Sequence, residues 1–216
     1  MNDAAELDSE YLNGELREHE RFYIPTGDIE FRVNNAIFKV HQHFLKKHST
    51  VLADMLDAPQ PDGRPSPSLT LTGDSIKGWE AILSLFYSED YFALPVFTSD
   101  QWAGILRVSH KYMMDSLEEK ARESLLKCQP PLDMVEMVLL AQEIDCNKLY
   151  EVACNTLAKS EITFDAAKRI GVSTFYNIIS LKLAIPPKCR ECPVGTASSM
   201  QHLQSRQGHQ VLNLHQ

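Results

Sequence analysis

Cys189 and Cys192 are separated by two residues, the spacing at which two thiolates can hold one zinc ion. A closed zinc site needs two more ligands at defined separations. The histidines that follow, His202 and His209, do not stand at the distances found in common zinc fingers. The sequence therefore favours two free thiols over a metal site, and we expect no cofactor.

Asp28 and His41 form a second pair of residues with chemical potential, as a general acid and a general base. His41 stands where an expected strand passes into an expected helix, which favours a hydrogen-bonded structural histidine. Asp28 begins a strand, where its carboxylate would accept backbone N–H groups and orient the turn. The sequence has no nucleophile motif and no glycine-rich phosphate loop, so we expect no catalytic residue and no enzyme. A hydrolytic or metal-binding protein using Asp28, His41 and the cysteine pair is the remote alternative.

A third candidate is a contact surface rather than a chemical site. The stretch from Tyr87 to Phe92 follows an expected helix and combines aromatic with acidic side chains. It is too apolar for a loop that faces only solvent, and such patches mark places where proteins touch. The sequence predicts a contact loop that includes Tyr87, Tyr91 and Phe92.

The elements that must position these residues begin with a hairpin. Ile29, Phe31 and Val33 alternate with charged residues, the period of a strand with one buried face. Asn34 and Asn35 have good turn chemistry, and alternation resumes up to residue 40. From residue 44 to 56 the apolar period becomes helical, which predicts one helix of about four turns.

Further along the chain, strand and helix signals continue to residue 184. Residues 58–67 and 88–97 are expected loops, residues 68–72 a third strand, and Asp74 or Ser75 the cap of a helix containing Trp79. Capping-box spacing at Thr98–Gln101 and again at Ser116–Glu119 predicts two more helices, with Trp79 and Trp102 in the core. After Pro131 the pattern is wholly helical, with expected helices at 132–145, 147–159, 163–171 and 173–184. The predicted fold is α+β: a small mixed sheet with a helical cluster, followed by an all-helical extension.

Composition limits the class of protein. The chain has 216 residues, 44% hydrophobic and 23% charged, with a net charge of −8, and seven acidic side chains fall within residues 1–20. No basic stripe is present, so nucleic acid is not an expected ligand. There is no signal peptide and no apolar run of membrane-spanning length, so no membrane partner is expected. Five cysteines, an odd number, predict an intracellular protein of cytoplasm or nucleus. Residues 1–22 are expected to be a solvated acidic segment, or alternatively a docking helix, and residues 186–216 a disordered tail.

Residues 23–127 resemble a BTB/POZ domain, in the divergent form abundant in mushroom-forming fungi. Asp28 lies thirteen positions before His41, as in that family. The other residues that carry the resemblance stand at the ends of strands and helices: Gly27–Ile29, Phe38–His41, Val51–Leu56, Leu69–Leu71, Phe86–Tyr87 and Val108–Tyr112. The helices at residues 128–185 resemble the helical extension that follows the domain in many relatives.

The resemblance implies a protein-interaction module that associates with itself or with another BTB-type protein. In animal relatives the dimer uses a helix before the first strand, which Ser9–Arg21 resembles, and a pocket that pairs the Asp with a basic residue after the His. Gln42 stands at that basic position here. An adaptor of a cullin-type ubiquitin ligase is the alternative. The hydrophobic-x-Glu signature of such adaptors has no match at Asp57-Ala-Pro-Gln-Pro-Asp62.

Overall fold

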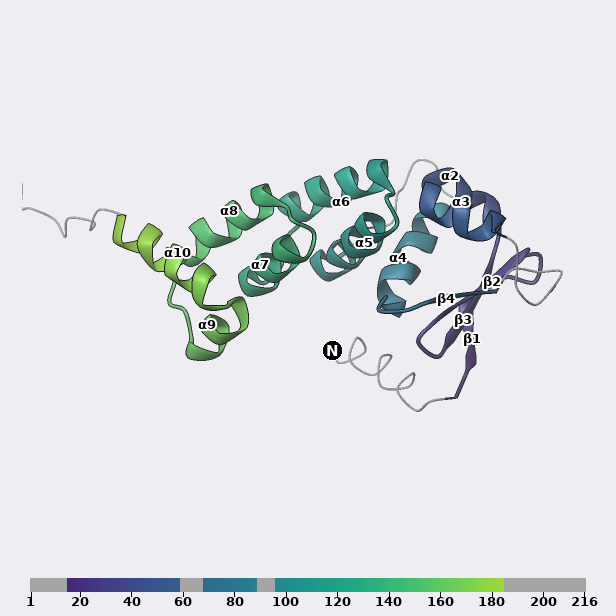
Figure 1. Ribbon diagram of the computed structural model, residues 1–216, viewed down its shortest axis with the longest axis horizontal. Helices are drawn as coiled ribbons and strands as arrows, with labels where there is room; N and C mark the ends of the chain where they lie inside the picture. The colour runs from purple at the N-terminus through teal and green to yellow at the C-terminus, as the bar shows by residue number, and fades with distance from the viewer. Residues whose placement is uncertain (1–14, 59–67, 89–95, 185–216) are drawn as a thin grey trace, which may run out of the picture. The chain divides into compact units, whose positions relative to one another are not determined.

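The computed structural model describes residues 15–58, 68–88 and 96–184 (Figure 1). Its strands are β1 (Arg17–Tyr23), β2 (Ile29–Val33), β3 (Ala36–Val40) and β4 (Ser68–Leu71). Its helices are α2 (Gln42–His48), α3 (Thr50–Asp57), α4 (Ile76–Phe86), α5 (Ser99–Lys111), α6 (Asp115–Lys127), α7 (Met134–Glu143), α8 (Asn147–Leu157), α9 (Phe164–Ile170) and α10 (Val172–Ala184). The α+β class, with a small mixed sheet and a following helical extension, is confirmed.

The four strands form one sheet in the order β1-β3-β2-β4. β2 and β3 are the expected antiparallel hairpin, with Phe31 opposite Phe38, and Asn34 turns the chain at a positive φ of 53°. The rings of Phe31 and Phe38 stack at 4.9 Å, and Trp79 of α4 covers Phe31 at 4.8 Å. The buried face of the hairpin thus packs against α4, as the alternation of apolar residues predicts.

β1 corrects the expectation for the acidic N-terminal segment, because residues 17–22 are neither a solvated segment nor a helix. β1 runs parallel to β3, with a register shift between Glu18 and Tyr23. The shift breaks the period of two, so the strand buries His19 and Phe22, three positions apart, and its sequence shows no alternation. Residues 1–14, like the expected tail at 186–216, lie outside the described residues.

Two short helices, α2 and α3, replace the single helix expected at 44–56. The chain breaks at Ser49, which has extended dihedrals of −141° and 119° and is 1% exposed. Its hydroxyl accepts the N–H of Leu52 at 3.0 Å and donates to the carbonyl of Tyr112 at 2.6 Å. A serine hydroxyl that caps a new helix while reaching a distant carbonyl competes with helix continuation.

The caps of the following helices agree with the sequence at two of three places. Ser75 caps α4 by accepting the N–H of Gly78 at 3.0 Å, and Thr98 and Gln101 form the expected capping box of α5. The box expected at Ser116 is wrong: α6 begins one residue earlier, at Asp115, and no side chain caps it. Backbone bonds from residues 117 and 118 to the carbonyl of Met114 start that helix instead.

The helical extension has the four helices that the sequence predicts after Pro131. Asp133 caps α7 by accepting the N–H groups of Val135 and Glu136 at 3.0 and 3.1 Å. Leu149 of α8 and Ile178 of α10 are fully buried and belong to the same continuous core as the residues of the sheet. Among the described residues, no helix is long and apolar enough to cross a membrane.

Candidate functional site

Asp28 and Gln42 lie in contact at the start of α2. The carboxylate of Asp28 accepts the backbone N–H of Gln42 at 2.7 Å and its side-chain amide at 3.0 Å. Partial burial opposes ionisation of Asp28, but the two bonds from Gln42 outweigh it and hold the pKa of this carboxyl below its usual value. His41, the N-cap residue of α2, makes no side-chain hydrogen bond to the first turn of the helix. The carboxylate of Asp28 instead accepts one of the free backbone N–H groups of that turn, the N–H of Gln42. The contact between Asp28 and Gln42 thus has a structural role, because it stabilises the start of α2.

His41 is held by hydrogen bonds on both sides of its ring. The backbone N–H of His41 donates to the hydroxyl of Tyr87 at 2.9 Å, and that hydroxyl also lies 2.9 Å from Nδ1 of the ring. Nε2 lies 3.3 Å from the hydroxyl of Thr26. Burial, as the largest influence, raises the pKa of Tyr87. Tyr87 therefore ties the end of α4 to the start of α2, and its side chain is half-buried.

The remaining candidates lie elsewhere or outside the structure. Tyr91 and Phe92 of the expected contact loop, and Cys189 and Cys192, are outside the described residues. Within the part of the chain that is described, no cluster of three or more His, Cys, Asp or Glu side chains could hold a metal ion.

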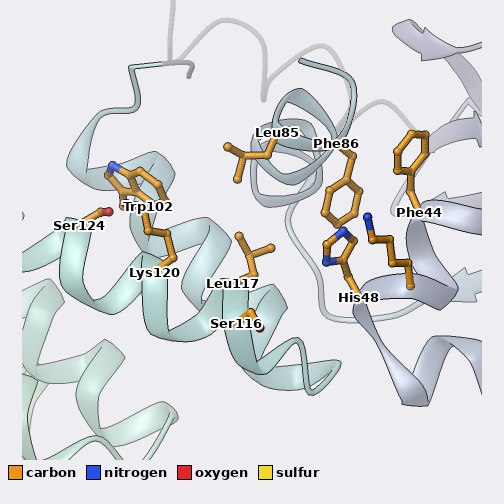
Figure 2. Close-up of a pocket in the computed structure, with 10 residues that line it drawn as sticks. Phe44, His48, Leu85, Phe86, Trp102, Ser116, Leu117, Lys120 and Ser124 are labelled. Carbon is orange, nitrogen blue, oxygen red and sulfur yellow. The ribbon is translucent and has the colours of Figure 1, made fainter. Parts of the chain in front are cut away.

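A groove of about 530 Å³ lies between α2, α4, α5 and α6. Figure 2 shows the side chains that line it converging from these four helices. The lining residues are Phe44, Lys47, His48, Leu85, Phe86, Trp102, Ser116, Leu117, Lys120 and Ser124. We call this hollow the α2–α6 groove. Half of its lining is large and apolar, which is unusual for a surface exposed to water.

Stacked aromatic rings form the wall that α2 and α4 contribute to the α2–α6 groove. Phe86 stacks on His48 at 4.7 Å and on Phe44 at 6.0 Å, with interplanar angles of 13° and 12°. Phe44 in turn meets the edge of Tyr87 at 4.9 Å. All of these rings are only half-buried. The wall is fixed in shape because each ring packs on the next, yet one side remains available for contact.

The charges that line the α2–α6 groove are all basic. Lys47 and Lys120 are exposed, and none of the ten lining residues is acidic. Burial, followed by the nearby charges of Lys47 and His43, lowers the pKa of His48. The imidazole is therefore neutral at physiological pH, and the two lysines carry the positive charge.

Sequence reasoning did not find this groove, although it identified several of its residues. Trp102 was expected in the core, but it is half-buried and faces the groove. Phe44 begins the apolar helical period expected at 44–56, and Phe86 is among the residues that carry the family resemblance. Each of these helices has more apolar residues than its core-facing side needs, and this excess is the sequence signal for the groove. Whether the extra residues line a groove or enter the core depends on how the four helices pack together.

Comparison with known proteins gives one clear result for this chain. No match was found among curated proteins. The family model of the BTB/POZ domain matches residues 14–129, a range that includes β1 and ends after α6. The match covers more than half of the 216 residues. The chain therefore belongs to the BTB/POZ domain family.

Proposed function

We propose that this chain is a non-catalytic protein-interaction module and that a partner protein binds in the α2–α6 groove. BTB/POZ domains are generally modules of protein–protein interaction, which supports the first half of the proposal. The observation that carries the second half is the groove itself. It is a preformed hollow with an aromatic wall on the surface of a domain whose other large apolar residues are mostly buried.

The energetics of association favour this surface. Binding energy at protein interfaces concentrates in aromatic side chains that lose their remaining contact with water. Phe44, Phe86 and Trp102 are half-exposed and already ordered by packing, so a partner that covers them gains apolar burial at little entropic cost.

The polar residues at the start of α2, Asp28 and His41, support a binding role over catalysis. Asp28 is occupied by Gln42, and His41 by Tyr87 and Thr26. Each contact joins α2 to a neighbouring element, so these residues fix the position of the helix that forms one wall of the groove.

Affinity capture with the full chain tests the proposal, with Leu117→Ser as the variant and Leu126→Ser as its control. Both leucines are half-buried on α6, but only Leu117 lines the groove. We expect wild type and Leu126→Ser to capture the same proteins, and Leu117→Ser to lose them while its melting temperature stays close to that of the control. Equal capture by both variants would contradict the groove as the binding site.

The same experiment addresses the identity of the partner. A cullin captured by the wild type and lost by Leu117→Ser would support the adaptor role. Self-association is followed by light scattering on the same three proteins, since a dimer that dissociates only in Leu117→Ser would make a second copy the occupant.

A further inference from the structure

The α2–α6 groove is elongated along one helix. Ser116, Leu117, Lys120 and Ser124 line it from a single face of α6, and eight residues of helix span about 12 Å. A smaller polar hollow of about 210 Å³ continues it towards Met113 and shares Lys47, His48, Ser116 and Leu117. A groove of this length matches two turns of a helix laid beside α6, whose pitch is about 5.4 Å per turn.

The apolar side chains that line the groove come from α2, α4, α5 and α6. Figure 2 shows Leu85 facing Leu117, with Trp102 drawn beside Lys120 at one end and Phe86 at the other. An amphipathic helix in such a groove presents side chains at i, i+3, i+4 and i+7 to the apolar wall and leaves its flanking positions at the rim. The wall is thus suited to a row of bulky apolar side chains rather than to a single small group.

The charge at the rim contrasts with that of the whole chain. The chain carries a net charge of −8, yet the two charged residues that line the α2–α6 groove, Lys47 and Lys120, are both basic. The smaller hollow adds one charge of each sign, Lys46 and Asp115. Glu118 of α6 is engaged in ion pairs: its carboxylate lies 2.5 Å from Arg122 and 3.4 Å from His110. The groove is therefore a basic site on an acidic protein.

From shape and charge together, we infer that the occupant of the α2–α6 groove is an amphipathic helix whose apolar face is flanked by carboxylates. The apolar face covers Phe86, Trp102 and Leu117, while the carboxylates meet Lys47 and Lys120. This inference rests on the proposed function and specifies the chemistry of the partner. Opposite charges at a rim raise the association rate and exclude segments with basic flanks, because like charges would face each other.

A direct test uses two synthetic helical peptides of about 15 residues, with leucines at i, i+3, i+4 and i+7. One has glutamates beside the leucines and the other has lysines at the same positions. Binding to the full chain is followed by tryptophan fluorescence, since Trp102 lines the groove and Trp79 is fully buried. We expect the glutamate peptide to bind about tenfold tighter than the lysine peptide at low salt, with the difference shrinking at high salt.

Charge-reversed variants locate the effect on the protein. The double variant Lys47→Glu with Lys120→Glu should weaken binding of the glutamate peptide about tenfold. The control double variant, Lys127→Glu with Lys148→Glu, changes the net charge equally and should leave this affinity unchanged. Equal binding of the two peptides, equal effects of the two variant pairs, or binding of neither peptide at roughly millimolar concentration would overturn the inference. If Leu117→Ser still abolishes partner capture in that case, the proposed function stands and only the acidic chemistry fails.

Discussion

Asp74 provides the sharpest prediction about what holds this domain together. Its side chain is 2% exposed and lies between α4 and the end of α5. One carboxylate oxygen accepts Nε1 of Trp79 at 2.9 Å and the hydroxyl of Tyr112 at 2.7 Å, and the other accepts the ammonium of Lys111. Burial, and then the bond to Asp74, raises the pKa of Tyr112, so its hydroxyl remains a donor at every physiological pH. Replacing Asp74 with alanine removes the acceptor for two buried donors at once.

The magnitude follows from these contacts. Each buried donor left without an acceptor costs about 1–3 kcal/mol, so Trp79 and Tyr112 together give about 2–6 kcal/mol. Lys111 adds little, because its side chain is 44% exposed and can return to water. We therefore expect Asp74→Ala to lower the free energy of unfolding by about 4 kcal/mol, a large part of the 5–15 kcal/mol typical of a domain.

Urea unfolding followed by tryptophan fluorescence measures this loss, with Asp74→Asn as the matched control. The asparagine keeps a carbonyl oxygen where Trp79 and Tyr112 donate, but its NH2 group, a donor, replaces the oxygen that accepts from Lys111. Because the Lys111 side chain is 44% exposed and can turn to water, the change should cost about 1 kcal/mol. Adding Tyr112→Phe to Asp74→Ala should recover stability by removing one stranded donor. The reasoning is refuted if Asp74→Asn costs as much as Asp74→Ala, or if Asp74→Ala costs under about 1 kcal/mol.

Three further predictions concern other parts of the domain. Ser49→Ala should cost about 2–3 kcal/mol in urea unfolding, because it removes the cap of α3 and strands a buried carbonyl; a loss below about 0.5 kcal/mol would contradict the role of the hydroxyl. Gly78→Ala should destabilise by about 1 kcal/mol although alanine favours helices, because the new Cβ would lie 2.8 Å from the Ser75 hydroxyl and 3.1 Å from the Gly104 carbonyl; a gain in stability would show that α4 and α5 can separate. His48 has a lowered pKa in the folded state, so the unfolded chain binds more protons below the ordinary value of about 6.5 and stability falls as the pH drops through that region. His48→Gln should flatten this dependence between about pH 7.5 and 5.5, and an unchanged slope would assign it to other groups.

The hairpin and the helical extension were predictable because their signals are local. The buried residues Ile29, Phe31 and Val33 alternate with more exposed ones within five residues. Asp133 caps α7 by accepting the N–H of Glu136, only three positions along the chain. The break at Ser49 was not predictable, because the hydroxyl's partner is the carbonyl of Tyr112, 63 residues later. A serine in a helical pattern looks the same whether or not a distant carbonyl draws it out of the helix.

β1 and the α2–α6 groove were missed for related reasons. The strand contains a register shift and buries His19, whose ring accepts two backbone N–H groups and donates to Glu80 at 2.7 Å. Because β1 buries a polar residue, His19, among charged neighbours, its sequence alone has the composition of a segment exposed to solvent. The groove needs four helices to meet, and half-buried residues such as Phe44 and Trp102 have the same helical spacing as core residues.

Amide hydrogen exchange on the full chain, with and without a captured partner that Leu117→Ser loses, tests the central claim most directly. The proposed function predicts that the partner slows exchange in α2, at the end of α4 and along residues 116–124 of α6, with little change in α8 and α10. Protection confined to the helical extension or to β1, with the groove helices unchanged, would contradict it.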